Sequence, residues 1–356
     1  MPSITKIKLQ NFRKFRQLEI NLKPEINTII GDNESGKSTI LQAIELVSSG
    51  SRHKVEAAGM ESLLNKACID DFNNGNRTIE KLPVLRVELY LSNAENPDLV
   101  GKNNTEDVHL SGLHMICEPN LELAGEINHA LGQDDNFPYE HYTVRFMTFS
   151  GEPYSSYRRF VNCLAIDSSL INNEYANKEY IKKVYDSVVD YPQRVRLKNE
   201  YRQQKVAFRN ENLNEVNGQI EDYDFAIRSG TKFNLETDLT LMQDQIPIDE
   251  RGKGQQCFIK TNFALTRNAN GQNIDLILLE EPENHLSHTN MNRLISKIAD
   301  THNNQIVVAT HSSLISSRLD LRNSILLNST SNVPLTLSAL TASTAKFFMK
   351  APDSNI

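Results

Sequence analysis

The sequence predicts an α/β protein with a mixed central sheet, an antiparallel side sheet and a helical insertion. Three observations favour this class. A short apolar strand at 27–30 runs into a glycine-bearing loop and then into a helical pattern. Two further apolar runs, at 273–279 and 305–310, are continuous, as in strands buried on both faces, and each ends in polar residues. Segments of alternating polarity elsewhere account for the side sheet.

Length and composition limit the classes of protein to consider. The chain has 356 residues, enough for about two domains or for one large domain with an insertion. A net charge of −7 and a charged share of 23% are typical of a globular protein. No segment approaches the roughly 20 apolar residues of a membrane span, and the N-terminus shows no secretory pattern, so we expect a cytoplasmic protein without a membrane partner. Four widely spaced cysteines indicate neither a disulfide framework nor a zinc site.

The first sixty residues carry a phosphate-binding motif. Strand patterns at 4–9 and 15–22 precede the strand at 27–30, and the loop after it matches GxxxxGK[ST] completely. The loop residues are Gly31, Asp32, Asn33, Glu34, Ser35, Gly36, Lys37, Ser38 and Thr39. Glycines let backbone amides converge on phosphates, Lys37 reaches the β and γ oxygens, and Ser38 ligates Mg²⁺. This motif predicts ATP and Mg²⁺ as cofactors.

Two carboxylates follow the apolar run at 273–279. Glu280 and Glu281 stand at the carboxyl end of a strand, where ligands bind in open α/β sheets. We expect Glu280 to help hold hydrated Mg²⁺ and Glu281 to polarise the water that attacks the γ-phosphate. The strand at 305–310 ends at His311, which we expect to touch the γ-phosphate or that water. Lys37, Glu281 and His311 are therefore the predicted catalytic residues.

A second glycine-bearing turn lies upstream of the acidic strand. Gly252, Lys253, Gly254 and Gln255 precede an apolar helical pattern, and a turn that opens a helix is an anion site. The turn lacks the lysine spacing of the first loop, so its position relative to the acidic strand is the informative feature.

The middle of the chain predicts the side sheet and the insertion. Alternating segments at 84–91, 113–117 and 142–149 are typical of antiparallel strands. Residues 172–245 predict a helical insertion, in which apolar residues recur at heptad-like spacing until Pro192 interrupts them. These apolar residues are Ile181, Val184, Val188, Tyr191 and Val195.

Part of the insertion is basic. Residues 178–210 contain nine Lys and Arg against four Asp and Glu, which suggests contact with a nucleic-acid backbone. The candidate DNA-binding residues are Lys182, Lys183, Arg194, Arg196, Lys198 and Arg202. A solvated helix face is the alternative, because residues 211–224 then bring five acids and no base.

The order of these motifs resembles the ATPase heads of the ABC class, in the branch of SMC, RecF and OLD (overcoming lysogenization defect) proteins. The resemblance is carried by Asn11-Phe12-Arg13, the Walker A loop at 31–39, the signature-like turn at 252–256, the Walker B residues Glu280-Glu281-Pro282, and Thr310-His311-Ser312. The run from Glu280 to Leu286 and the tail from Thr341 to Phe348 are most similar to the OLD-family endonucleases, which include the large subunit of the Gabija anti-phage system.

This resemblance implies how the motifs work together. Two heads associate around nucleotide, as a homodimer or a higher homo-oligomer, and Arg13 joins the nucleotide-binding residues. Gly252, Lys253, Gly254 and Gln255 act in trans on the γ-phosphate held by the other protomer, with Lys253 supplying charge. The turn lacks the serine and one glycine of Leu-Ser-Gly-Gly-Gln, Glu280 stands where many relatives have Asp, and no Q-loop glutamine is evident.

In OLD-family proteins a tail like this leads into a C-terminal Toprim nuclease domain. The resemblance therefore implies an ATPase that controls an attached or partner Toprim nuclease, which acts on DNA in anti-phage defence. It implies no nuclease activity of this chain itself. We divide the chain into an ATPase lobe at 1–171, the insertion at 172–245, a second ATPase lobe at 246–340 and the tail at 341–356. Two alternatives stay open: a RecF/SMC-like DNA-repair ATPase, and a nucleotide-binding assembly module with little turnover.

Overall fold

The computed structural model describes most of the chain. The described residues are 2–92, 96–132, 137–169, 174–220, 222–230, 233–266, 274–300, 304–328, 333–337, 341 and 343–344. Most of the predicted tail and residue 273 of the acidic strand therefore lie outside the described part.

An antiparallel sheet forms one layer of the molecule. Its strand order is β2-β1-β4-β6-β5, and β7 also pairs with β6. The strands are β1 (Ser3–Phe12), β2 (Phe15–Asn21), β4 (Leu85–Ser92), β5 (Val100–Gly101), β6 (Leu110–Pro119) and β7 (Tyr142–Thr148). Burial alternates along β2, because one face of the sheet packs on the core and the other does not. The predicted side sheet is confirmed.

The central sheet is mixed, as predicted, with the order β14-β13-β3-β12-β11-β8. All neighbours are parallel except β13 and β14. The strands are β3 (Ile26–Gly31), β8 (Cys163–Asp167), β11 (Leu276–Glu280), β12 (Gln305–Thr310), β13 (Ser324–Leu327) and β14 (Leu335–Thr336). Because β3, β8, β11 and β12 run in one direction, their carboxyl ends meet at one edge. We call this edge the nucleotide edge and define it by Gly31, Asp167, Glu280 and Thr310.

Helices bury both faces of the central sheet. Helix α1 (Lys37–Ser49) lies between the two sheets, and its Ile40 and Ile44 share a core with Leu278 and Val307. The opposite face packs against α6 (Glu174–Val188), α10 (Lys253–Thr266), α11 (His288–Ala299) and α12 (Ser313–Arg318). Strands covered on both faces need apolar residues at every position, which explains the continuous apolar runs in the sequence.

The remaining helices of the head are short and lie in the connections between strands. The helices are α2 (Arg52–Ala58), α3 (Met60–Leu63), α4 (Lys66–Asn74) and α5 (Ala124–Leu131). Single 3-10 turns occupy Ile79–Lys81, Pro97–Leu99, Leu121–Leu123, Tyr139–His141, Ile248–Glu250 and Leu321–Asn323.

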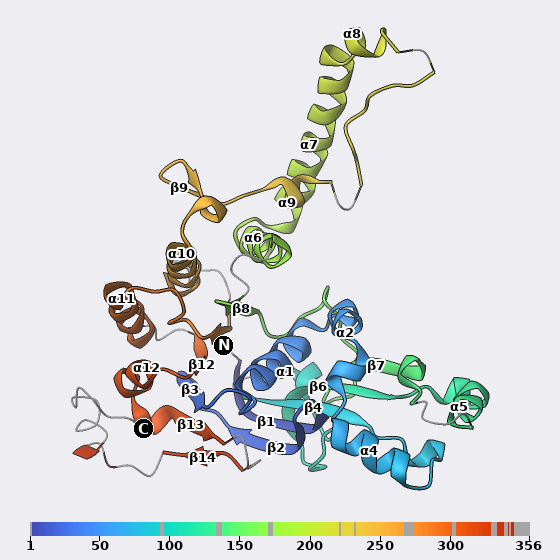
Figure 1. The fold of residues 1–356 in the computed structure, drawn as a ribbon, viewed down its shortest axis with the longest axis vertical. Coiled ribbons are helices and arrows are strands. Elements are labelled where there is room, and N and C mark those ends of the chain that lie inside the picture. Colours follow the sequence, from blue (N-terminus) through green and yellow to red (C-terminus); the bar gives the residue numbers. More distant parts are fainter. Residues whose placement is uncertain are drawn as a thin grey trace.

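The insertion projects from the head. Figure 1 shows α7 extending away from the sheets, with the following chain returning alongside it. Its elements after α6 are α7 (Tyr191–Asn212), α8 (Asn214–Asn217), α9 (Leu235–Asp238) and β9 (Met242–Gln243). Strand β9 pairs with β10 (Ile246–Pro247), which directly follows the insertion. The Asp190 side chain caps α7 by accepting from the Gln193 N–H at 2.8 Å. Pro192 lies in the first turn, where the missing N–H is not needed, so it starts a helix.

The heptad-like spacing does not form one seam. Ile181 and Val184 are buried in the core against the central sheet. Val188, Tyr191 and Val195 are exposed, Tyr191 by 71%. The apolar residues of α6 therefore pack on the central sheet. Those of α7 are exposed, because α7 extends away from the sheets.

Candidate functional site

The loop between β3 and α1 has the geometry of a phosphate-binding loop. Gly36 has φ 101°, and a Cβ there would lie 2.3 Å from the Phe15 ring. The Lys37 ammonium donates to the carbonyl oxygens of Gly31 at 2.7 Å and Asp32 at 2.9 Å, so it folds back onto its own loop. Burial lowers the pKa of Lys37, and the nearby Glu281 carboxylate opposes that change. The ammonium is thus held beside the loop in a partly desolvated position.

Glu280 at the end of β11 faces the start of α1. The Ser38 hydroxyl lies close enough to its carboxylate to favour the ionised form. Burial raises the pKa of Glu280, and the neighbouring Asp167 and Glu281 carboxylates act in the same direction. A hydroxyl and one carboxylate fit Mg²⁺, which takes few protein ligands and completes its shell with water and phosphate oxygens. In the described part of the chain no group of three or more His, Cys, Asp or Glu side chains is arranged to hold a metal ion.

Glu281 is held in a turn directly after β11. Its N–H donates to the Ala309 carbonyl at 2.8 Å, and its φ is 44°. The Asn284 amide donates to Glu281 Oε2 at 2.7 Å. Glu281 Oε1 lies 3.4 Å from Nδ1 of His311, which stands directly after β12. The structure thus brings the predicted water-activating carboxylate and the predicted switch histidine together.

Arg13 reaches the nucleotide edge from the turn between β1 and β2. Its backbone N–H donates to the Leu63 carbonyl at 2.7 Å, and its backbone carbonyl accepts from the Asn65 side-chain amide at 2.6 Å. Burial lowers the pKa of Arg13, while Glu280 raises it, so the guanidinium lies within electrostatic reach of the Glu280 carboxylate. Its Nε is buried and has no hydrogen-bond partner among the described residues. An anion would satisfy this donor.

Three residues of these motifs have strained backbone conformations. Arg13, Glu34 and Glu281 have φ values of 48°, 63° and 44°, although none is glycine. Such conformations cost about 1–3 kcal/mol each and persist only where the surroundings enforce them. The site is therefore preorganised by its neighbours.

Two residues at the end of β8 belong to the edge and were not predicted. Asp167 is in register with Glu280 across the β8–β11 pair. The Ser168 N–H donates to the Glu280 carbonyl at 3.2 Å, and its hydroxyl donates to the Glu281 carbonyl. The signal was available, because residues 163–167 are an apolar run that ends in an acid, like the run before Glu280.

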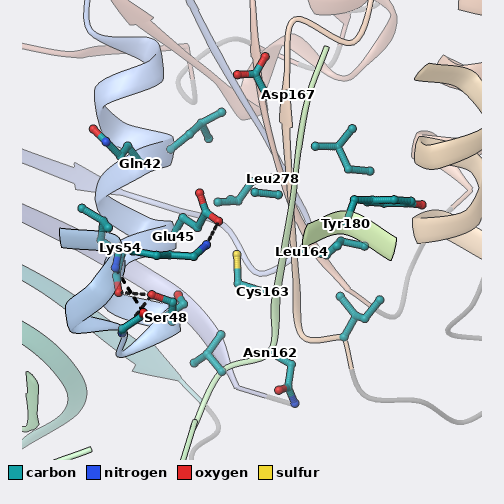
Figure 2. A pocket seen from close by; sticks show the side chains of 18 of the residues that line it. Gln42, Glu45, Ser48, Lys54, Asn162, Cys163, Leu164, Asp167, Tyr180 and Leu278 are labelled. Atoms are coloured by element: carbon teal, nitrogen blue, oxygen red, sulfur yellow. Dashed lines mark hydrogen bonds and ion pairs between the residues drawn. The ribbon is translucent and has the colours of Figure 1, made fainter. Parts of the chain in front are cut away.

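A cavity of about 940 Å³ adjoins the loop. It reaches Arg13, Ser38 and Glu280. Figure 2 shows Gln42 and Glu45 of α1 on one wall, β8 along the middle and Tyr180 of α6 on the other wall. Lys54 pairs with Glu45 at 2.6 Å on the α1 side. The nucleotide edge therefore opens on one side into a cavity lined by both polar and apolar side chains.

The signature-like turn lies at the start of α10. Gly252, Lys253 and Gln255 are exposed. Gly254 is packed, because a Cβ there would lie 2.1 Å from the His285 carbonyl oxygen. The turn thus rests against the chain that follows Glu281 in its own protomer and presents Gly252 and Lys253 outward.

The basic residues of the insertion are largely paired. Lys182 and Lys198 face Glu236 at 3.5 and 2.6 Å, Arg196 faces Glu200 at 3.7 Å, and Arg194 pairs with Asp186. Arg202 donates to the Asn199 side chain at 3.2 Å, and the Lys183 side chain lies outside the described part. Residues 172–245 together hold eleven Lys and Arg against thirteen Asp and Glu. DNA contact by these residues stays a prediction, and their pairing weakens the argument for it.

Comparison with known proteins places this geometry among ATPase heads. A family model described as an AAA ATPase domain matches residues 3–223 and 164–315. The DNA replication and repair protein RecF of Bacillus mycoides (strain KBAB4) is 35% identical over 51 residues, 14% of each chain. RecF of Chlamydia abortus (strain DSM 27085 / S26/3) is 38% identical over 48 residues, 14% of this chain and 13% of the relative. These matches span about a seventh of the relatives' length.

Solved structures share the fold over nearly the whole chain. The crystal structure of the SmcHead bound to the C-winged helix domain of ScpA has a TM-score of 0.52 at 14% identity, covering 94% of this chain and 99% of that one. The recombination mediator protein RecF with ATPrS has a TM-score of 0.50 at 11% identity, covering 94% and 98%. The predicted fold, an ABC/SMC/RecF-like P-loop ATPase head, is confirmed. None of the described helices combines the length and apolar character needed to cross a membrane.

Proposed function

Because the chain belongs to the AAA ATPase domain family, we propose that it binds ATP with Mg²⁺ at the nucleotide edge and hydrolyses it. One observation supports this most directly. Lys37, Ser38, Glu280, Glu281 and His311 come from segments up to 274 residues apart and meet where β3, β11 and β12 end. This set contains the phosphate-binding, metal-binding and water-activating groups that phosphoryl transfer requires.

The loop and the acidic strand would hold the nucleotide. Backbone amides of residues 31–39 surround the phosphates, and Lys37 exchanges its loop carbonyls for the β and γ oxygens. Ser38 and Glu280 would hold Mg²⁺, which neutralises charge on the phosphates when bound. Arg13 adds a positive charge from the β1–β2 turn.

Glu281 would orient the attacking water and accept its proton. Asn284 occupies one carboxylate oxygen, so the other, 3.4 Å from His311, is the one that acts. His311 lies beside it and would contact the γ-phosphate. Glu281, His311 and Lys37 are thus the proposed catalytic residues.

A second protomer would complete the site. Gly252, Lys253, Gly254 and Gln255 would face the γ-phosphate of the partner in a homodimer or larger assembly. The exposure of Gly252 and Lys253 supports this arrangement, because both face away from their own head. Lys253 would add a positive charge from the partner protomer to the one that Lys37 supplies from the protomer's own loop.

ATP binding and hydrolysis by the associated heads would control DNA processing. We propose, from the likeness of the run from Glu280 to Leu286 to OLD-family proteins, that heads associated by ATP control an attached or partner Toprim nuclease in anti-phage defence. The likeness to RecF favours a second candidate, an ATPase of DNA repair with the same chemistry. A nucleotide-binding assembly module with little turnover is the third.

ATP turnover per protomer, measured against protein concentration, tests the ATPase. Specific activity should rise with concentration, because a site shared by two heads gains activity as they associate. Glu281→Gln should lower turnover about 100-fold or more while ATP binding is retained. Glu126→Gln, an exposed acid on α5, is the matched control and should leave turnover unchanged.

Two results would count against this proposal. Specific activity that does not depend on concentration across the range where the protein passes from monomer to dimer would exclude the shared site. Tight ATP binding without turnover in the unmodified chain would favour the assembly module.

A further inference from the structure

We propose that Glu283 is a positioning residue that holds the end of β12, and with it His311, in register with the turn that carries Glu281. This inference rests on the ATPase function proposed above. Glu283 is the third acid of the run after β11, and neither the phosphate-binding motif nor the paired acids give it a task.

The contacts of Glu283 cross between two strands. Its Oε1 accepts from the Thr310 hydroxyl and from the His311 backbone N–H, the latter at 3.3 Å. The same oxygen lies 3.7 Å from Nδ1 of the His311 ring. One carboxylate oxygen thus meets the hydroxyl, the backbone and the ring at the junction of β12 and α12. Because Glu283 follows Glu281 by two residues, these contacts link the carboxylate that activates water to the histidine beside it.

Burial indicates that the contact is specific. The Glu283 side chain is only 9% exposed, against 28% for Glu281 and 48% for His311. Its Oε2 is buried and has no hydrogen-bond partner among the described residues. A buried carboxylate with one unsatisfied oxygen is costly, and a neutral side chain would be cheaper if the turn only needed filling. The compensation comes at Oε1, which accepts from Thr310 and from the His311 backbone, so the position of this acceptor is the property that the turn retains.

The same turn also contacts the signature-like helix. Cys257 Sγ of α10 lies 3.7 Å from the Pro282 carbonyl oxygen, and Gly254 packs against the His285 carbonyl. The segment 282–285 is therefore clamped between the start of α10 on one side and the end of β12 on the other. Glu283 is the side chain in this segment that bonds to β12.

Two carboxylate oxygens lie near one ring nitrogen of His311. Because Glu281 Oε1 at 3.4 Å and Glu283 Oε1 at 3.7 Å are both close to Nδ1, a neutral ring is favoured to carry its proton on Nδ1 and not on Nε2. Nε2 then keeps a lone pair and is the nitrogen left to face the water or phosphate. Loss of Glu283 should loosen both the position of the ring and this preference.

Substitutions at Glu283 and Thr310 test the assignment. Glu283→Ala removes the acceptor and should lower kcat about tenfold or more, with the Kd for ATP changed by less than about threefold. Glu283→Gln keeps an oxygen at Oε1 and should recover most of kcat. Thr310→Val removes only the hydroxyl, should lower kcat less than Glu283→Ala, and should add little in combination with it.

The ¹⁵N spectrum of the His311 ring in the nucleotide-free protein supplies a readout independent of turnover. The unmodified chain should show the Nδ1–H form, and Glu283→Ala should shift the ring toward a mixture of forms while thermal unfolding shows the variant folded. If Glu283→Ala unfolds, Thr310→Val carries the same comparison.

The outcomes separate the two proposals. An unchanged ring spectrum together with kcat within twofold in Glu283→Ala and Thr310→Val would overturn the positioning role. Equal losses in Glu283→Gln and Glu283→Ala would also overturn it, because charge and not the acceptor position would then matter. Absence of turnover in the unmodified chain would overturn the ATPase proposal instead, and the ring spectrum would still decide the role of Glu283.

Discussion

The nucleotide edge and the insertion use the same charged residue types in opposite ways. At the edge, burial raises the pKa of Glu280 and lowers that of Lys37, so each group is altered by its surroundings. On the insertion, pairs such as Arg209 with Asp224 lie on the surface, 45% and 60% exposed. Exposed pairs contribute little energy and are screened by salt. Burial, more than the number of charges, therefore marks where chemistry is concentrated.

The basic stretch shows the consequence. Counted along the chain, 178–210 is rich in Lys and Arg, but the chain that returns beside α7 brings Asp224, Glu236 and Asp238 to it. The local excess of positive charge is thus matched by acids from later in the sequence. A charge run indicates a ligand only when folding leaves it unmatched.

The largest expected effect concerns a buried group of the head. His114 of β6 is fully buried, and burial, aided by the nearby Arg86 charge, lowers its pKa to about 4. An unfolded histidine has a pKa near 6.5, so between these values the unfolded chain binds a proton that the native chain does not. The contribution of neutral His114 to the free energy of unfolding is fully present above about pH 6.5. The free energy of unfolding should fall by about 3 kcal/mol as the pH drops to 4.

Urea unfolding of the unmodified chain and of His114→Gln at pH 7 and at pH 4.5 measures this effect. The variant should lose less stability between the two pH values than the unmodified chain does. His53→Gln, on the exposed surface of α2, is the control. An identical pH dependence in all three proteins would show that burial of His114 does not govern it.

A smaller effect is the difference in stability that alanine substitution should cause at the two glycines of the signature-like turn. Gly254→Ala should cost about 2 kcal/mol in the free energy of unfolding, because its Cβ meets the His285 carbonyl at 2.1 Å. Gly252→Ala meets nothing within 4 Å and should change stability by less than about 0.5 kcal/mol. If Gly252 faces nucleotide in trans, its substitution should still lower ATP turnover at high protein concentration.

Thermal unfolding and turnover of both variants check this contrast. Equal stability losses at the two positions would contradict the packing of Gly254 against the 282–285 segment. Normal turnover of Gly252→Ala would contradict the role in trans.

The smallest expected effect is on the insertion. Although burial opposes it, Lys198 and Lys182 lower the pKa of Glu236, so this carboxylate is ionised and neutralises part of the basic stretch. Glu236→Gln should change stability by less than about 1 kcal/mol. If the insertion binds DNA, the freed lysines should raise its affinity for DNA. The dependence of that affinity on salt concentration should steepen as expected for up to about two additional phosphate contacts.

Fluorescence anisotropy with a short duplex at several salt concentrations checks this prediction. Glu200→Gln, which faces Arg196 at 3.7 Å on the same helix, releases a single charge and is a graded control. No binding at low salt by any of the proteins would remove DNA contact from the insertion.

Much of the fold and site was predictable because the signals are local. Gly31 to Thr39 form a contiguous motif, and the burial of β11 and β12 on both faces leaves a continuous apolar run ahead of Glu280 and His311. Asp167 was missed although β8 has the same strand-then-acid pattern. Glu283 could not be recognised, because its meaning depends on Thr310, which reaches it only through the pairing of β11 and β12.

By itself the sequence determined the fold class, the presence of two sheets, the GxxxxGK[ST] loop and the identity of Glu280, Glu281 and His311 at two strand ends. The period of apolar residues and the spacing of motif residues are properties of contiguous segments, so the sequence is enough to recognise them. Only the tertiary structure decided which charges are buried, which are paired, and which oxygen faces His311. Those properties depend on distances of a few ångströms between residues remote in sequence, and electrostatic energies change steeply over such distances in a desolvated site.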